Sequence, residues 1–128
     1  MPLDIQIQNR VEAGETAAVT IKLTGSLDTL TAPELEQWLG PVLAGPVTEI
    51  IFDLAELRFV SSAGLRVFAL VRRILKERGG RVSFIHLQPQ IQEVFDIMKS
   101  LPGVAIFKDL AEMDRYLAAR QRAHSENR

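Results

Sequence analysis

The stretch Asp53-Leu-Ala-Glu-Leu-Arg-Phe-Val-Ser-Ser-Ala-Gly-Leu65 decides the fold, because an apolar strand there leads through two serines directly into a helix. The run Ile50–Leu54 is nearly continuous in apolar residues, which predicts a strand covered on both faces. The following helix is expected from about Ser62 to Arg78, ending at two glycines. The start of a helix presents free N–H groups and a positive dipole end that favour an anion. A serine there can be a helix cap, a nucleophile or a phosphate acceptor.

The residues before this stretch predict a hairpin and a helix. Apolar and polar residues alternate over 3–8 and again over 19–24, which indicates two half-buried strands joined by a turn near 13–15. Thr31-Ala-Pro-Glu34 has capping-box spacing with proline in the first turn, and apolar residues follow at helical intervals. We therefore expect a helix from Thr31 to just before Gly45.

The residues after the central helix alternate between strand and helix patterns. We expect a strand over 82–85, a helix over 91–98, a short strand over 104–107, and a last helix capped by Asp109. The polar end from Arg120 to Arg128 is expected to fray, so the predicted domain covers 1–119 and a polar tail covers 120–128.

This order of elements predicts an α/β fold: a single domain with a mixed, mostly parallel β-sheet flanked by about four α-helices. In such sheets the functional crevice lies at the carboxyl ends of the parallel strands. The loop from Phe59 to Gly64 is predicted to lie at such an end.

The composition of the chain excludes several classes of function. The chain has 128 residues, which suits one domain, and its formal net charge of −1 gives no reason to expect nucleic-acid binding. There is no cysteine, which excludes disulfides, thiol catalysis and cysteine-ligated metal. We see no secretory signal and no segment of roughly 20 apolar residues that would insert into a membrane, so a cytoplasmic protein is expected.

Three segments of the chain resemble the STAS domain family, and within it the bacterial anti-sigma factor antagonists of sporulation and general-stress control. They are Leu23-Thr-Gly-Ser-Leu-Asp28 with Thr31-Ala-Pro-Glu-Leu35, Asp53–Leu65, and Pro89-Gln-Ile-Gln-Glu-Val-Phe-Asp96. The family carries its phosphorylated residue at the first serine of an Asp-Ser-Ser-Gly-Leu pattern, which corresponds to Ser62. Ser61 stands where many members have aspartate, and Ala63 where many have serine or threonine.

The resemblance implies a partner switch rather than an enzyme. The unphosphorylated protein would bind an anti-sigma factor that is also a serine kinase, with ATP bound by that partner, and would free the sigma factor. Phosphorylation at Ser62 would end the binding, and a serine phosphatase would reset it. Ser61 is the secondary candidate acceptor. The resemblance implies no cofactor and no metal, and these partner-binding residues: Asp28, Ser61, Ser62, Ala63, Gly64 and Arg66.

Other readings of the same residues stay open. Ser62 fits a helix cap and Asp28 fits a turn residue, and both residue types are common in those places. The basic residues that follow Arg66 on the central helix are expected to form a solvated face. A serine hydrolase would need a histidine base, and neither His86, at a strand end, nor His124, in the polar tail, is a convincing one. The alternative function is a STAS scaffold of a stress-signalling complex, or an accessory subunit of a lipid transporter, with constitutive binding.

Overall fold

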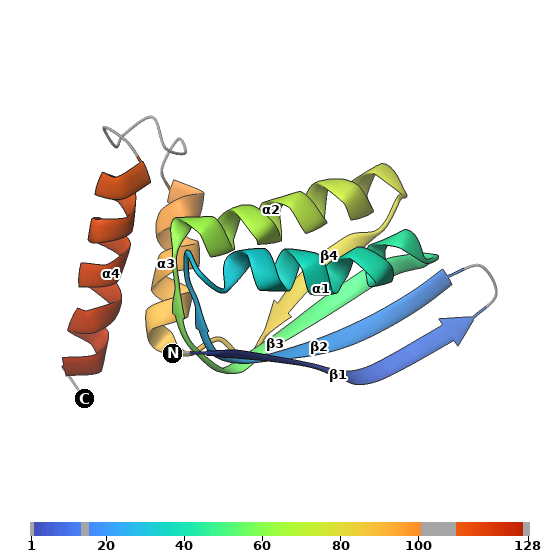
Figure 1. Cartoon of the computed structure of the whole chain (residues 1–128), viewed down its shortest axis with the longest axis horizontal. Coiled ribbons are helices and arrows are strands. Elements are labelled where there is room, and N and C mark those ends of the chain that lie inside the picture. Colours follow the sequence, from blue (N-terminus) through green and yellow to red (C-terminus); the bar gives the residue numbers. More distant parts are fainter. Residues whose placement is uncertain (1, 14–15, 101–109, 127–128) are drawn as a thin grey trace.

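The computed structural model describes residues 2–13, 16–100 and 110–126. Over these residues the chain forms four strands and four helices (Figure 1). The strands are β1 Leu3–Ala13, β2 Thr16–Leu27, β3 Val47–Val60 and β4 Arg81–Ile85. The helices are α1 Ala32–Ala44, α2 Ser62–Glu77, α3 Pro89–Ser100 and α4 Leu110–Glu126. The predicted turn at 14–15, strand at 104–107 and cap at Asp109 lie outside the described residues.

The strands lie in the order β1-β2-β3-β4 in one sheet. β1 and β2 pair antiparallel, whereas β2 with β3 and β3 with β4 pair parallel. The parallel pairs follow from the helices that intervene in sequence, because only a crossover returns the chain to the same edge of the sheet. The predicted α/β class and the mixed, mostly parallel sheet are confirmed.

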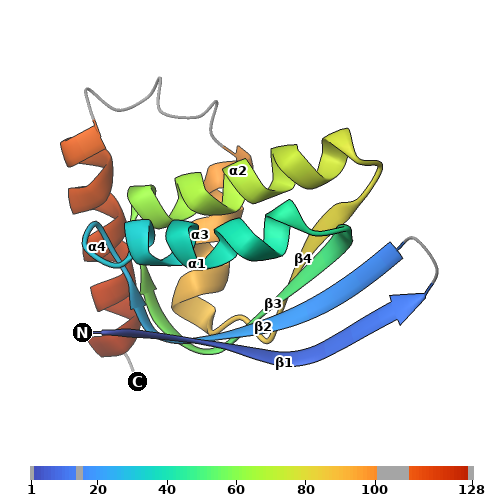
Figure 2. The same ribbon diagram turned by 45° about the vertical axis from the view of Figure 1, so that its right-hand side comes forward.

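The core lies between this sheet and the helices α1 and α2, which run side by side over one face (Figures 1 and 2). Phe52 of β3 stacks on its register partner Phe84 of β4, with ring centroids 5.7 Å apart. Phe68 of α2 and Phe95 of α3 close the cluster, since the centroid of Phe68 lies 5.1 Å from Phe52 and that of Phe95 lies 4.9 Å from Phe84. Aromatic pairs at these spacings add to the apolar burial that holds helix and strand together.

The expectation that the run Ile50–Leu54 is covered on both faces was wrong for the described part of the chain. Ile50, Phe52 and Leu54 are fully buried; on the other face Asp53 is also buried, but Ile51 is only partly buried. Alternate side chains of a strand point to opposite faces, and α1 and α2 cover only one of them.

Helix α4 stands across the end of the sheet at which α1 and α2 begin, beside α3 (Figures 1 and 2). We expected the chain to fray from Arg120 onward, but α4 continues to Glu126 and Gln121 is 4% exposed. Contacts distant in sequence hold this segment: Arg120 pairs with Glu93 of α3, and Gln121 bonds to β3. A polar sequence alone does not reveal such contacts.

Candidate functional site at the start of α2

The predicted crevice residues lie where β3 ends and α2 begins, and we call Val60–Gly64 the β3–α2 junction. It is tied to the end of the neighbouring strand β2, because the N–H of Ser61 donates to the carbonyl of Leu27 over 2.9 Å. The same bond brings Asp28, the residue after Leu27, beside the junction. The two segments that the sequence singled out are therefore neighbours.

Ser61 and Ser62 have different positions at the start of α2. Ser61 has an extended backbone, precedes the first helical residue, and its hydroxyl accepts a long hydrogen bond of 3.4 Å from the N–H of Gly64. Ser62 is the first residue of α2 itself. The cap role that the sequence also allowed for Ser62 thus belongs to Ser61. Each serine is 4% exposed.

Gly64 allows the first turn of α2 to pack closely on β2 and β3. A Cβ atom at this position would lie 2.6 Å from Cγ of Leu27 and 3.0 Å from Cγ2 of Val60. These distances are shorter than side-chain contacts in proteins, so a larger residue would push the helix away. Gly64 is buried, and its neighbour Ala63 is partly buried against the core.

Asp28 organises the loop that leads into α1. Its Oδ1 accepts the N–H of Leu30 over 2.9 Å and the N–H of Thr31 over 3.0 Å. The hydroxyl of Thr31 accepts the N–H of Asp28 and donates to the carbonyl of Ser26. The expected capping box at Thr31 is not formed, because this hydroxyl is engaged with the preceding loop.

Gln121 of α4 forms two hydrogen bonds with the backbone of Val60, the last residue of β3. Its Oε1 accepts the N–H of Val60 over 2.9 Å, and its Nε2 donates to the carbonyl of Val60 over 2.8 Å. One buried side-chain amide therefore bonds both backbone polar groups of Val60, a buried residue at the end of β3. Leaving such groups without partners costs about 1–3 kcal/mol each.

Asp114, about two turns before Gln121 on α4, contacts the start of α2. Its Oδ1 accepts the N–H of Ser62 over 2.8 Å. A free N–H group at the beginning of a helix is a favoured place for a carboxylate. The anion expected at this position is thus supplied, in the structure, by a side chain of the same protein.

Exposed side chains surround the junction. Leu30, in the loop before α1, is 82% exposed, which is unusual for a large apolar residue in so ordered a loop. Arg66, in the first turns of α2, is also exposed. Together they offer one apolar and one basic contact beside the buried serines.

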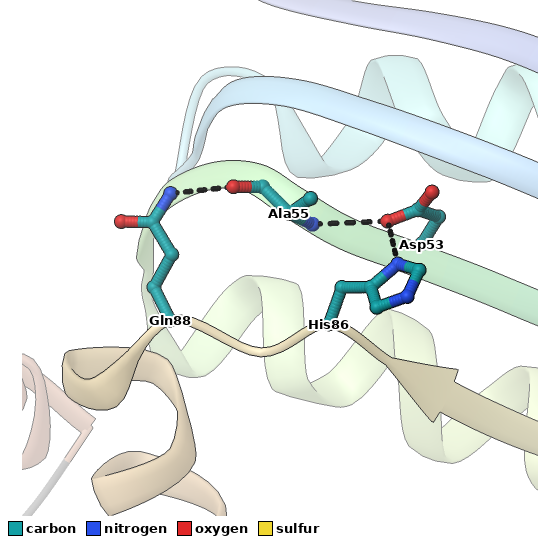
Figure 3. Close-up of polar contacts among 4 residues, drawn as sticks. All are labelled: Asp53, Ala55, His86 and Gln88. Atoms are coloured by element: carbon teal, nitrogen blue, oxygen red, sulfur yellow. Dashed lines mark hydrogen bonds and ion pairs between the residues drawn. The ribbon is translucent and has the colours of Figure 1, made fainter.

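A second polar cluster lies at the carboxyl end of β4 (Figure 3). Nδ1 of His86 is 3.1 Å from Oδ1 of Asp53, which also accepts the N–H of Ala55, and Nε2 of Gln88 donates to the carbonyl of Ala55. Burial by itself would raise the pKa of Asp53, but the Ala55 N–H, the His86 ring and the charge of Lys22 together hold that pKa below its ordinary value. His86 has a left-handed backbone, with φ of 60°, which a tight turn requires.

The His86–Asp53 pair does not contact Ser61 or Ser62 and so cannot act as their base. Asp53 and Ser61 are eight residue steps apart along β3 and its end, which is roughly 26 Å of extended chain. The pair instead ties the turn after β4 to β3. Among residues 2–13, 16–100 and 110–126, no group of three His, Asp or Glu side chains could hold a metal ion. No helix in that part of the chain is long and apolar enough to cross a membrane.

The sequence reasoning missed three residues of the site: Leu30, Asp114 and Gln121. A signal existed for the last two, because Asp114, Leu117 and Gln121 recur at helical spacing and so share one face of α4. Their partners, however, are 52 and 61 residues away in sequence. Of the predicted residues, the structure brings together Asp28, Ser61, Ser62, Ala63, Gly64 and Arg66.

Comparison with known proteins gives one family match and several relatives. The profile of the STAS domain family matches residues 4–113. BtrV of Bordetella bronchiseptica, named as an anti-sigma factor antagonist, is 35% identical over 75 residues, which are 59% of this chain and 65% of that protein. That match spans less than two thirds of the relative's length. The anti-sigma-B factor antagonist of Staphylococcus epidermidis is 29% identical over 77 residues, or 60% of this chain and 71% of its own length.

Solved structures show the same fold. The anti-sigma factor antagonist SpoIIAA in its unphosphorylated form has a TM-score of 0.58 and 26% identity, over 73% of this chain and 83% of that chain. The phosphorylated form of this Bacillus protein matches with the same TM-score and identity, over 73% and 82% of the two chains. Anti-sigma factor antagonists are regulatory proteins and not enzymes, in keeping with the sequence analysis.

Proposed function

This chain belongs to the STAS domain family, and from that premise we propose that it is an anti-sigma factor antagonist switched by phosphorylation at Ser62. The unphosphorylated protein binds an anti-sigma factor that is also a serine kinase, and the sigma factor is released. The observation that carries the proposal is the position of Ser62 as the first residue of α2, at the carboxyl end of a central parallel strand. The named relatives are antagonists, and SpoIIAA is known in both phosphorylated and unphosphorylated forms.

The start of α2 suits a phosphate in the free protein. Phosphorylation adds about −1.5 to −2 charge at neutral pH, and the N–H groups of a first helical turn stabilise that charge. The same phosphate opposes partner binding, because docking would remove its water while Asp28 lies beside the junction. A 100-fold loss of partner affinity corresponds to about 2.8 kcal/mol, and burying a dianion in the interface can supply a difference of this size.

We propose that the partner contacts Asp28, Leu30 and Arg66 around the junction. Leu30 supplies an apolar contact. Its side chain is 82% exposed in the free protein, so binding can bury nearly all of its apolar surface. Asp28 is held by its own loop, so it presents a fixed carboxylate. Asp28→Asn is expected to change partner affinity without unfolding the domain, and an unchanged affinity in a binding titration would reduce Asp28 to a turn residue.

The remaining steps belong to other proteins. The kinase partner brings ATP, and a serine phosphatase removes the phosphate and resets the switch, all within the cytoplasm. The proposal assigns no cofactor, nucleic acid or membrane contact to this chain.

The acceptor is tested by mass spectrometry of protein incubated with the kinase and Mg-ATP. Ser62→Ala should bind the kinase but remain unmodified, whereas Ser61→Ala, the matched neighbour, should still be phosphorylated. Phosphorylation of Ser62→Ala but not of Ser61→Ala would move the acceptor to Ser61.

The switch is tested by a pull-down from extract of the source cell with Mg-ATP, using wild-type and Ser62→Asp baits. Capture of an ATP-binding regulator by the wild type, and its loss with Ser62→Asp, supports partner switching. Equal capture of one partner by both baits would instead indicate a scaffold or an accessory subunit with constitutive binding, and Ser62 would have only a structural role.

A further inference from the structure

We propose that α4 is a displaceable cover of the β3–α2 junction, and that docking of α4 and a phosphate on Ser62 exclude each other. In the closed state, which the structure shows, α4 hides Ser62. In the open state, α4 leaves the junction and Ser62 becomes accessible. The mutual exclusion of docked α4 and phosphate rests on the proposed function, which identifies Ser62 as the acceptor. The closing and opening of α4 do not depend on that assignment.

The contacts of α4 with the junction are made to backbone groups on both sides of Ser61. Gln121 bonds both polar groups of Val60, and Asp114 accepts the N–H of Ser62. Both serines are 4% exposed in this arrangement. A kinase must enclose a hydroxyl within its own active site, so the closed state cannot be its substrate.

Helix α4 has 17 residues, and few of its described side chains are buried. Among its described side chains, only Leu117 and Gln121 are buried, whereas α2 buries six residues along its length. Arg120 adds an ion pair with Glu93 of α3, in which the Arg120 side chain is half-exposed and the Glu93 side chain is mostly buried. Helices with few buried apolar contacts are the parts of a protein that open without global unfolding.

A phosphate and Asp114 compete for the same position. The carboxylate of Asp114 occupies the N–H of Ser62, which is among the donors that a phosphate at the start of α2 would use. Placed together, the two anions would repel each other at hydrogen-bond distance in a site from which water is largely excluded. Because coupling is reciprocal, docking of α4 that disfavours the phosphate is itself disfavoured by the phosphate.

The opening of α4 is tested on the full chain without any partner. The natural chain contains no cysteine, so Ser62→Cys introduces a single thiol whose reaction rate with a thiol reagent reports access to the junction. Adding Gln121→Ala or Asp114→Ala should raise this rate about tenfold, because each removes a contact that holds α4 closed. Arg122→Ala, on the exposed side of the same helix, should leave the rate unchanged.

Circular dichroism shows whether each variant keeps its fold. Asp114→Ala leaves the buried amide of Gln121 in place, so it serves as the test if Gln121→Ala proves too disruptive. Equal thiol rates in folded Asp114→Ala and in its Ser62→Cys parent would overturn the cover.

The exclusion is tested by hydrogen exchange of residues 110–126 in wild-type protein and in Ser62→Asp. A negative side chain at Ser62 should increase exchange of α4 about tenfold while leaving that of α1 unchanged. Equal exchange of α4 in the two proteins would overturn the exclusion. Neither measurement uses a kinase, so a failure of the proposed partner switch and a failure of the cover give different results.

Discussion

The helices α1 and α2 begin side by side after neighbouring parallel strands, but their first turns are held in different ways. Before α1, the bonds are local: Asp28 and Thr31 bond one another and the loop between them. At α2, the N–H of Ser62 is bonded by Asp114, which is 52 residues away in sequence. A local bond forms whenever its own turn forms, whereas a bond from α4 lasts only while α4 is docked.

This difference explains how two similar helix starts can have different functions. The start of α1 is a permanent structural feature that presents Asp28 and Leu30 in fixed positions. The start of α2 has a replaceable anion partner, which is what a phosphorylation switch requires. The following predictions test the contrast, beginning with the largest expected change in stability.

Gly64→Ala should destabilise the fold by about 1–3 kcal/mol, because the added methyl group would lie 2.6 Å from Leu27. The matched control is Gly40→Ala in α1, where nothing lies within 4 Å of the added atom. That change should alter the free energy of unfolding by less than about 1 kcal/mol, because the gain in helix propensity is offset by crowding against the ring of Pro41. Urea unfolding followed by circular dichroism measures both. Equal effects at the two glycines would show that α2 is not closely packed at its start.

Asp28→Ala should cost about 1 kcal/mol, because two N–H groups of the loop lose their acceptor. Asp28→Asn keeps an acceptor oxygen and should cost less. Asp4→Ala, at an exposed position of β1, is the control and should change the free energy of unfolding by less than about 0.5 kcal/mol. If Asp28→Ala matched this control, the loop before α1 would not depend on its own side chains.

The smallest effect is expected at the His86–Asp53 pair, which is remote from both helix starts. A carboxyl whose pKa is lowered by folding stabilises the protein above its ordinary pKa of about 3.9, and this stabilisation disappears as the pH falls through the lowered value. His86→Ala should raise the pKa of Asp53 toward that ordinary value, as carboxyl NMR titration would show, and stability should then decline less between pH 5 and pH 2.

The control for that prediction is the same substitution in an Asp53→Asn background, where no carboxyl remains to titrate. There His86→Ala should leave the dependence of stability on acid pH unchanged. A pKa of Asp53 that is the same with and without His86 would contradict the assigned interaction.

Local patterns predicted most of the fold and only part of the site. The change from apolar strand to helix at Ser61–Ser62 was visible in sequence because both periodicities meet there. The prediction of a capping box at Thr31 was wrong. The Thr31 hydroxyl bonds the N–H of Asp28 and the carbonyl of Ser26 in the preceding loop, and residue spacing alone does not reveal these bonds. Asp114 and Gln121 could not be assigned, because their roles depend on where α4 docks. The polar residues around Gln121 in sequence indicate an exposed segment, whereas the Gln121 side chain is buried against β3.

The central claim is that a phosphate on Ser62 controls partner binding, and calorimetric titration of the captured kinase with the two forms of this protein tests it most directly. The account predicts that the phosphorylated form binds roughly 100-fold more weakly than the unmodified form. Equal dissociation constants for the two forms would contradict it.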